Sequence, residues 1–525
     1  MLSVSFYTLG CKLNQLESES LASQFRDKGF KVLSWALPGG EGGTVRACTD
    51  RAGCGDAADI YVINTCTVTS KAEQKARRMI RKALRDSPCS IVIATGCYAE
   101  LDKPEIEALG SAGRLFVIPG SRKSALLSLP AFLAEAGGLE DPARIRGLAA
   151  LWFSRFMDAS TPPACALKGS SAGDPPPEEL SENRQDASPR LPAAFEFEPF
   201  SFVPSRFSFH TRAFLKIQEG CDNRCSYCRV SLARGRSRSL EAAEVLDRVK
   251  RLENQGYAEA VLTGVNISQY RDVSPGQGGS AAEPLDSPDL AYLLKRLLRG
   301  TDRIKLRLSS IEPDAIHERL LETISSPRIQ PHFHLSIQSG SSFILERMRR
   351  SYSPEEVIRK IGQLRLVKGD PFIACDIITG FPGESEAEFE KTCILCKEAG
   401  FAWIHAFPYS PRRGTEALDF KGKISEREAA VRVKRLIDLA GEGRRAYISR
   451  WLGREVDAVI EECCIKADEI EAGTAPYAAG LSDNYLKLLI RTNGKPSPPR
   501  GSILRCRLRC LPGGQSSRFD VTADM

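Results

Sequence analysis

The spacing of hydrophobic residues differs between parts of the chain and predicts different secondary structure in each part. Short apolar runs that alternate with amphipathic segments of helical period occupy the first hundred residues and return from Ala213 onward. This alternation is typical of parallel α/β domains. A charged helical stretch ends near Leu452, and short alternating strands separated by Gly and Pro follow it. Such strands predict a small all-β module at the C-terminus.

The N-terminal part is predicted to be a small parallel α/β domain. Strands are expected at residues 4–9, 29–32, 58–63 and 91–94, with helices at 14–29 and 71–85. Cys11, Cys66 and Cys97 each follow the carboxyl end of a predicted strand. In an open parallel sheet these ends line one crevice where ligands bind, so the three thiols could converge. Three buried structural cysteines are the alternative, because free cysteines are common in protein cores.

The central part repeats the strand–helix pattern six times. Strands are expected at residues 213–217, 259–262, 304–308, 332–337, 372–378 and 402–406. Polar, Gly-rich or Pro-rich residues follow each strand. A full or partial parallel barrel would gather these strand ends on one face, where the active sites of such barrels lie.

Two stretches do not have the composition of a folded domain. Residues 38–56 are Gly-rich, carry Cys48 and Cys54, and are predicted to form a surface loop. Residues 136–209 have a Pro- and Glu-rich centre and are predicted to be an insertion or linker that is partly disordered. The expected domains therefore span residues 1–135, 210–445 and 446–525.

The loop after the first barrel strand carries the most specific chemical pattern, Cys221-x3-Cys225-x2-Cys228. Thiolates are the usual protein ligands of iron–sulfur clusters. Three thiolates can hold three irons of a four-iron cluster and leave the fourth iron open to a small molecule. The alternative is a structural zinc loop, which requires four closed ligands and for which His210 is the nearest further candidate.

Composition and charge narrow the possible partners. No apolar run approaches the roughly 20 residues that span a bilayer, and the first residues do not resemble a signal peptide, so a cytoplasmic protein is expected. The 17 cysteines are then expected to bind metal, act in catalysis or lie buried. The net charge is +7, and residues 71–85 contain seven Lys or Arg and one Glu. From Asn484 to residue 525 the sequence contains eight Lys or Arg and only two Asp. This excess of positive charge suits an RNA partner.

The motifs taken in order resemble the methylthiotransferase family of radical S-adenosylmethionine (SAM) enzymes. The segments TLGCKLNQLESE, INTCTVTSKAEQKARRMIR and ATGCYAE are similar to its N-terminal domain. The segments EGCDNRCSYCRV, LTGVNISQY, RLSSIEP, LSIQSG, DIITGFPGE and HAFPYSPRRGTEA are similar to its radical SAM core. The segment LSDNYLKLLI is similar to the TRAM domain, a small RNA-binding β module. The resemblance does not cover residues 38–56 or about 137–204.

This resemblance implies an α/β fold with a parallel N-terminal domain, a partial (β/α)6 radical SAM barrel and a TRAM-like β-barrel. It implies two [4Fe-4S] clusters, one SAM-binding on Cys221, Cys225 and Cys228 and one auxiliary on Cys11, Cys66 and Cys97. No side chain beyond the cluster ligands is expected to be catalytic. The candidate SAM contacts are Tyr227, Gly264, Asn266, Ser310, Glu312, Gln338 and Asp376. The candidate tRNA contacts are Arg78, Arg81, Arg412 and Arg413.

The sequences of Gly10–Gln15 and Ser410–Thr415 resemble the branch that acts on N6-threonylcarbamoyladenosine at position 37 of tRNA, next to the anticodon. Sister branches, which act on N6-isopentenyladenosine-37 of tRNA or on a ribosomal-protein aspartate, are the alternatives. C2 of adenine carries an unactivated C–H bond, so radical chemistry from a cofactor is expected. The expected partners are tRNA and an electron donor such as flavodoxin or ferredoxin, with no membrane and a monomeric enzyme. A metal-containing RNA-binding protein is the non-enzymatic alternative.

Overall fold

The computed structural model describes residues 2–34, 58–111, 113–137, 142–157, 198–272, 288–465, 477–492, 496–510 and 518–524. The predicted loop at 38–56, with Cys48 and Cys54, lies outside the described residues, as do residues 158–197 of the predicted linker. The chain divides into two compact units. The first unit comprises Met1–Leu9, Ser20–Thr65 and Gln74–Ser205, and the second comprises Gly10–Glu19, Cys66–Glu73 and Arg206–Met525.

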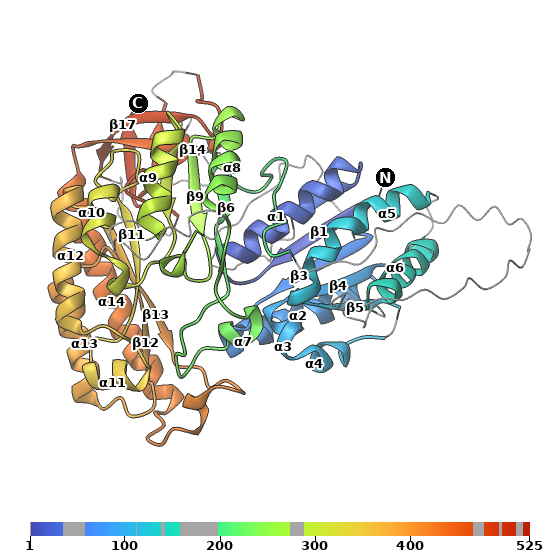
Figure 1. Ribbon diagram of the computed structural model, residues 1–525, viewed down its shortest axis with the longest axis horizontal. Helices are drawn as coiled ribbons and strands as arrows, with labels where there is room; N and C mark the ends of the chain where they lie inside the picture. The colour runs from blue at the N-terminus through green and yellow to red at the C-terminus, as the bar shows by residue number, and fades with distance from the viewer. Residues whose placement is uncertain are drawn as a thin grey trace, which may run out of the picture. The chain divides into compact units, whose positions relative to one another are not determined.

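The first unit is built on a parallel five-stranded sheet (Figure 1) with the order β2-β1-β3-β4-β5. Its strands are β1 (Ser3–Thr8), β2 (Lys31–Ser34), β3 (Ile60–Thr65), β4 (Ile91–Gly96) and β5 (Leu115–Pro119). Two of the three inner strands, β3 and β4, are buried at every position, as expected for parallel strands that are covered on both faces. The predicted parallel α/β domain is therefore confirmed. Strand β5 was not predicted, because a run of four apolar residues does not distinguish a strand from a buried turn.

Helices connect these strands and extend the unit beyond them. They are α1 (Lys12–Asp27), α2 (Ser70–Asp86), α3 (Cys97–Leu101), α4 (Lys103–Glu107), η1 (Gly120–Ser128), α5 (Leu129–Ala136) and α6 (Pro142–Met157). The first residues of α1, up to Glu19, and of α2, up to Glu73, belong to the second unit. Helix α6 falls within the stretch predicted as linker. Its Trp152 is buried and donates a hydrogen bond to the Ser128 hydroxyl (3.3 Å), and its Phe153 meets Phe116 of β5 at 5.2 Å between ring centroids. The segment after Gly137 therefore begins with a packed helix.

The second unit contains a partial (β/α)6 barrel, as predicted. Two parallel three-stranded sheets form it, β6-β9-β10 and β11-β12-β13. The strands are β6 (Ala213–Lys216), β9 (Glu259–Thr263), β10 (Lys305–Leu308), β11 (His332–Gln338), β12 (Phe372–Thr379) and β13 (Trp403–Pro408). Parallel bridges between Leu306 and Ile329 and between Ile311 and Leu335 join the two sheets. The two end strands of the order, β6 and β13, are not paired with each other, so the barrel is open on one side.

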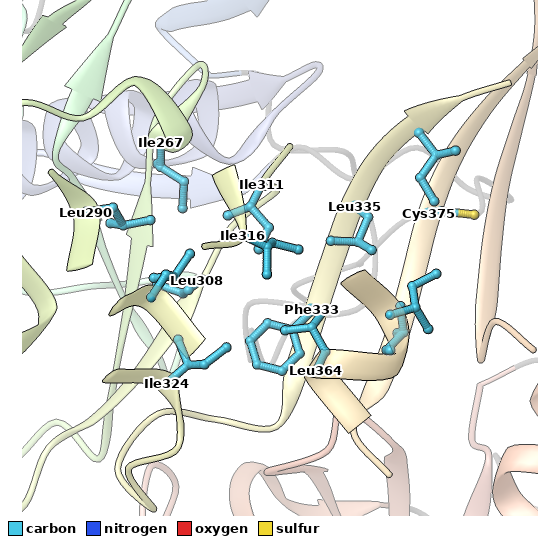
Figure 2. Close-up of a cluster of buried hydrophobic side chains, with 14 of the residues drawn as sticks. Ile267, Leu290, Leu308, Ile311, Ile316, Ile324, Phe333, Leu335, Leu364 and Cys375 are labelled. Carbon is cyan, nitrogen blue, oxygen red and sulfur yellow. The ribbon is translucent and has the colours of Figure 1, made fainter. Parts of the chain in front are cut away.

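Helices cover the outside of this barrel and enclose its main hydrophobic core. The longer ones are α8 (Ala242–Asn254), α9 (Leu290–Gly300), α10 (Glu318–Ile324), α12 (Pro354–Lys368), α13 (Glu386–Ala399) and α14 (Glu426–Trp451). Figure 2 shows Phe333, Leu335 and Cys375 of the strands beside helix residues such as Leu364. Because side chains alternate along a strand, His332, His334 and Asp376 belong to the opposite face, which is the barrel interior.

The C-terminal module is a closed five-stranded barrel, which confirms the all-β prediction. Its order is β14-β15-β16-β18-β17, from β14 (Glu455–Ile465), β15 (Tyr477–Ser482), β16 (Lys487–Arg491), β17 (Ile503–Arg509) and β18 (Val521–Asp524). Tyr485 was predicted to begin a strand, but it lies in the β15–β16 turn with φ +67°. Its ring stacks on His332, the first residue of β11, at 3.9 Å. The turn therefore contacts the amino-terminal end of the (β/α)6 barrel.

Candidate active site

The loop with three cysteines is folded back on itself after β6. It begins in β7 (Gln218–Glu219) and returns in β8 (Arg238–Ser239), and these two strands pair antiparallel. Gly220 between them has φ +73°, and a Cβ there would lie 1.9 Å from the carbonyl oxygen of Arg236. The Cys221 N–H donates to the Gly235 carbonyl at 3.0 Å. Only glycine fits at position 220, and the loop closure fixes where the first thiol leaves the backbone.

The three thiols of this loop are partly buried and lie close enough for their charges to interact. Burial raises the pKa of Cys221 and of Cys225, and it raises that of Cys228 to about 11. A backbone N–H from Val230 donates to the Cys228 sulfur (3.4 Å) and favours its thiolate. Three adjacent thiols that resist ionisation need a bound cation to become thiolates, and iron supplies that charge. This donor set fits an iron–sulfur cluster.

Within the described residues, no three Cys, His, Asp or Glu side chains are gathered as ligands of a single metal ion. A four-iron cluster does not require such a gathering, because each thiolate binds a different iron. His210, the further ligand that a zinc loop would need, has its Nδ1 2.8 Å from a carboxylate oxygen of Glu19. The histidine is thus engaged away from the cysteine loop.

A hydrogen-bonded group of polar side chains lies beside the cysteine loop. The Glu312 carboxylate accepts from the side-chain amides of Asn223 (2.8 Å) and Asn266 (2.9 Å) and from the Arg350 guanidinium (2.5 Å). After burial, the charges of Arg350 and Glu312 have the largest effects on the pKa of Cys225, lowering and raising it respectively. Sequence reasoning missed Arg350, because nothing in the sequence separates it from its exposed neighbour Arg349.

The remaining candidate SAM contacts lie at the carboxyl ends of the strands. The Ser310 hydroxyl lies 2.5 Å from Nδ1 of His334, and the other ring nitrogen of His334 lies 3.3 Å from Asp376. Gln338 has φ +70° next to a register shift in β11, a local bulge of the kind common beside active sites. A Cβ at Gly264 would lie 2.8 Å from the side chain of Gln218. The Tyr227 ring meets Phe381 edge-on at 6.3 Å. Their contact with SAM stays a prediction.

Cys11, Cys66 and Cys97 follow β1, β3 and β4, which are neighbours in the N-terminal sheet. The register pairs Thr65 with Gly96, so Cys66 and Cys97 each directly follow a paired residue. Thr8 pairs with Asn64, and Cys11 comes three residues after Thr8. This topology meets the condition from which convergence was predicted. A shared cluster on these three cysteines stays a prediction.

Two glycines shape the backbone around these cysteines. Gly10 has φ +95°, and a Cβ on it would lie 2.7 Å from the Cys66 sulfur. Gly96 has φ +102°, and a Cβ on it would lie 2.3 Å from the Thr65 carbonyl oxygen. Side chains are excluded at both places because the backbone there packs directly against the Cys66 side chain and the Thr65 backbone.

A buried network of charged groups joins the two cysteine-bearing segments within the second unit. Glu73 lies 3.4 Å from the Arg229 guanidinium and also binds Arg412. The Thr67 hydroxyl donates to Glu73 (2.6 Å) and accepts from Arg412 (2.8 Å). Thr67 directly follows Cys66, and Arg229 directly follows Cys228. The network therefore couples the backbone beside one predicted cluster ligand to the backbone beside another.

The predicted tRNA contacts have different surroundings. Arg412 is buried in this network, whereas Arg413 is exposed. Arg78 and Arg81 are exposed on α2, opposite the buried Met79 and Ala83. Contact with tRNA stays a prediction for all four arginines, and for Arg412 it would require an exchange of partners.

Two family models match the sequence. Residues 215–396 match the Radical SAM superfamily, and residues 45–117 match a family described as "Uncharacterized protein family UPF0004". The first match covers the cysteine loop, the polar strand ends and most of the barrel. The fold and the site thus define a radical SAM enzyme, a class whose members use SAM and a [4Fe-4S] cluster.

Relatives that match nearly the whole chain assign the protein to a narrower family. The threonylcarbamoyladenosine tRNA methylthiotransferase MtaB of Treponema pallidum is 39% identical over 518 residues, which are 97% of this chain and 98% of that protein. MtaB of Bacillus subtilis is 31% identical and covers 94% of this chain and 91% of its own length. The chain belongs to the methylthiotransferase family of radical SAM enzymes, as its motifs predicted.

Among solved structures, the radical SAM methyltransferase TsrM of Kitasatospora setae matches with a TM-score of 0.44 and 15% identity, over 78% of this chain and 75% of that chain.

No helix within the described ranges combines the length and apolar character needed to cross a bilayer.

Proposed function

We propose that this protein inserts a methylthio group at C2 of N6-threonylcarbamoyladenosine at position 37 of tRNA, in the cytoplasm. The observation that carries this proposal is the match, over almost the full chain, to two relatives named for that activity. The Lys12-Leu13-Asn14 triplet after Cys11 agrees with it. N6-isopentenyladenosine-37 and a ribosomal-protein aspartate are alternative targets for the same chemistry.

Two groups of three cysteines would hold the cofactors. Cys221, Cys225 and Cys228 would bind the SAM-associated [4Fe-4S] cluster, and Cys11, Cys66 and Cys97 would bind a second [4Fe-4S] cluster. When bound, the first cluster and SAM together supply a radical able to break an unactivated C–H bond. A one-electron donor such as flavodoxin or ferredoxin is needed to reduce it, and the enzyme is proposed to act as a monomer.

The polar side chains next to the cysteine loop would hold the methionine part of SAM. Glu312 and Arg350 present a carboxylate and a guanidinium, which are matched to an amino acid's ammonium and carboxylate. Asn266 donates to Glu312 and keeps that carboxylate oriented. The apolar contact between Tyr227 and Phe381 forms a wall that excludes water beside the cysteines.

Nucleoside mass spectrometry of tRNA from a strain that lacks this protein tests the substrate. We expect the methylthio group to disappear from threonylcarbamoyladenosine while the threonylcarbamoyl group itself remains. Intact levels of the methylthiolated nucleoside would contradict the proposal. Its loss from isopentenyladenosine instead would assign the alternative tRNA target.

Anaerobic reconstitution tests the cofactors. Two four-iron clusters require about eight irons per chain. We expect Cys66→Ala to hold about four irons, to cleave SAM and to insert no sulfur, whereas Cys225→Ala is expected to lose both reactions. One zinc per chain and no SAM cleavage would favour the metal-containing RNA-binding protein instead.

A further inference from the structure

The first two turns of α1 are anchored on the (β/α)6 barrel. Residues Gly10–Glu19 belong to the same compact unit as the barrel. Leu16 is buried in one cluster with Phe214 of β6. The Glu19 carboxylate accepts from two backbone N–H groups of the segment before β6, at 2.9 and 2.7 Å. Cys11, which directly precedes α1, is therefore attached to the barrel through the helix that follows it.

A buried network of two cations and two anions joins α1 to the cysteine loop. Glu17 of α1 lies 3.1 Å from both the Lys216 ammonium and the Arg234 guanidinium. Glu219 binds the same two cations, Lys216 at 2.7 Å and Arg234 at 2.9 Å. The exposed fraction of each of the four side chains is below a tenth. Their four charges cancel, so each cation is compensated inside the protein.

Arg234 links this network to the backbone that carries the three cysteines of the loop. It is the last residue of α7 (Val230–Arg234), which begins two residues after Cys228. The next residue, Gly235, accepts the hydrogen bond from the Cys221 N–H at 3.0 Å. A displacement of Arg234 would therefore move the backbone at both ends of the set of three thiols.

Asn14 connects the same guanidinium to the segments that bear Cys11 and Cys66. Arg234 donates to the side-chain oxygen of Asn14 at 2.7 Å, and Asn14 is fully buried. The side chain of Asn14 lies against Gly10, where an added Cβ would be 3.4 Å from the Asn14 nitrogen and 2.7 Å from the Cys66 sulfur. The hydrogen bond between Arg234 and Asn14 thus joins the cysteine loop to the residues that pack on Cys66.

This arrangement defines position more than it adds stability. Buried ion pairs contribute little net stability relative to apolar side chains of similar volume, because desolvation offsets their attraction. The guanidinium, however, donates in fixed directions to Asn14, Glu17 and Glu219 at the same time. Three acceptors on one planar donor determine how the start of α1 is oriented on the cysteine loop.

We propose that Arg234 is a positioning residue, which through Asn14 and Glu17 fixes the segment bearing Cys11 on the cysteine loop and so keeps radical formation coupled to sulfur insertion. This inference rests on the proposed function. Reacting groups must be held closely, since a displacement of about 1 Å can lower a rate by about 100-fold. Without this anchor, the place where sulfur is inserted would no longer be fixed relative to the place where the radical forms.

Two substitutions remove the contact from its two sides. Asn14→Ala removes the acceptor, and Arg234→Lys keeps the positive charge beside Glu17 but lacks the second nitrogen that reaches Asn14. Arg251→Gln, on α8 with a side chain that is 60% exposed, is the matched control.

Amide hydrogen exchange of the full-length protein tests the anchor independently of catalysis. We expect each variant to exchange roughly 3- to 10-fold faster than wild type in peptides that span residues 10–19, because a buried hydrogen bond is lost. Helix propensity alone predicts the opposite for Asn14→Ala, since Ala favours a helix more than Asn does. The double variant should show less than the product of the two single effects, because both remove the same contact. Exchange at the wild-type rate in both single variants overturns the inference.

The reconstituted enzyme then tests the coupling, with an anticodon stem-loop RNA that carries threonylcarbamoyladenosine. The measured quantity is 5′-deoxyadenosine formed per methylthiolated nucleoside. A radical that misses the RNA takes a hydrogen atom from the thiol reductant of the assay and leaves a thiyl radical, so it yields 5′-deoxyadenosine without product. We expect Asn14→Ala and Arg234→Lys to raise the ratio by about tenfold or more, and Arg251→Gln to keep the wild-type value.

The ratio separates positioning from a merely structural role, because loss of folded enzyme lowers both products in proportion. Faster exchange with an unchanged ratio overturns the role in coupling. If Arg234→Lys does not retain iron, Asn14→Ala decides by the same ratio. Methylthiolation of an isopentenyladenosine RNA in place of the threonylcarbamoyladenosine RNA would refute the proposed substrate, and the ratio on that RNA would then decide the role of Arg234.

Discussion

The carboxylate of Glu73 binds two buried guanidinium groups beside the predicted cluster ligands. Arg229 and Arg412 both point at it, and the exposed fraction of each side chain is below a tenth. Removal of one partner from a buried ion pair leaves an uncompensated charge, which costs more than the pair contributed. The two arginines would then repel each other next to Cys66 and Cys228.

We therefore expect Glu73→Gln to lower the free energy of unfolding by about 3–5 kcal/mol. It should also reduce the iron content after reconstitution, because Thr67 and Arg229 directly adjoin predicted ligands. Denaturant unfolding of the reconstituted protein measures the first effect and iron analysis the second. Arg85→Gln is the control on the same helix: its side chain is 75% exposed, so its removal should change stability by less than about 0.5 kcal/mol. Equal stability of the two variants would contradict this account.

This network also shows what sequence reasoning could not reach at the residue scale. The six cysteines could be proposed as cluster ligands because three share a local spacing and the other three each follow a predicted strand. Glu73 and Arg412 are 339 positions apart, and no local pattern relates them. Arg412 was instead interpreted from its place after a barrel strand, where a basic residue suits tRNA. Burial and partners depend on tertiary packing, which hydrophobic periodicity does not encode for a single charged side chain.

At the scale of elements, the cysteine loop contains two glycines with similar positive φ angles and different surroundings. Gly220 has φ +73° and Gly235 has φ +70°. A Cβ at Gly220 would meet the Arg236 carbonyl oxygen, whereas a Cβ at Gly235 would meet nothing within 4 Å. Substitution of each glycine by Ala therefore distinguishes the effect of backbone strain from the effect of a steric collision in the same loop.

Gly235 has φ +70° and ψ −160°, a region that is essentially restricted to glycine, so Gly235→Ala is expected to cost about 1–3 kcal/mol from backbone strain alone, and the loop should still bind iron. Gly220→Ala adds a collision with backbone that cannot move without opening β7 from β8, so the loop should lose its closed form. We expect anaerobic reconstitution of Gly220→Ala to yield about four fewer irons than Gly235→Ala. Full iron loading of Gly220→Ala would show that the closed loop is not needed for the cluster.

Helix α2 places its basic residues on one exposed stripe. Ala76, Met79, Ile80 and Ala83 bury the opposite face. Arg77 donates to the Tyr98 hydroxyl (2.7 Å), and Lys82 and Arg85 bind Asp86. Arg78 and Arg81 are exposed, and neither forms an ion pair with the residues described here. They are therefore available to phosphates, as are the exposed Lys71 and Lys75 of the same helix.

If α2 contacts tRNA, each phosphate contact adds about one unit to the dependence of log affinity on log salt. We expect Arg78→Gln with Arg81→Gln to reduce that slope by about two and to weaken binding of all tRNAs alike. Arg155→Gln, at an exposed position on α6, is the control and should leave the slope unchanged. An unaltered slope in the double variant would assign tRNA contact to another surface.

The order of the predicted elements agrees with the structure, but some strands were not predicted at all. The strands of the (β/α)6 barrel were expected near their observed bounds, because each is an apolar run that ends in turn residues. Strand β15 was missed, since its sequence Tyr-Ala-Ala-Gly-Leu-Ser is rich in residues with low β-propensity. It is nevertheless buried at every position inside the closed barrel. Tertiary packing there outweighs local preference.

At the scale of the whole second unit, the C-terminal barrel and the (β/α)6 barrel share a polar contact. Arg307 donates to the Asp483 carbonyl (3.1 Å) while it binds Glu259, and Tyr485 stacks on His332. Deletion of the C-terminal barrel would expose these buried groups. A truncated enzyme that loses tRNA binding would therefore not show that this barrel binds RNA, because the barrel end itself would be altered.

Substitution on the outer face of β17 tests RNA binding without opening that contact. Arg505, Arg507 and Arg509 alternate with the inward-facing Cys506 and Leu508. They form exposed ion pairs, for example Arg507 with Glu455 at 3.1 Å. Exposed pairs contribute at most about 1 kcal/mol, so the arginines can exchange their carboxylate partners for phosphates at little cost. Replacing all three by Gln should reduce the salt slope of tRNA binding by up to about three, while replacing all three by Lys should preserve it. A glutamine variant with the wild-type slope and an unchanged melting temperature would mean that the C-terminal barrel stabilises the enzyme without contacting tRNA through this face.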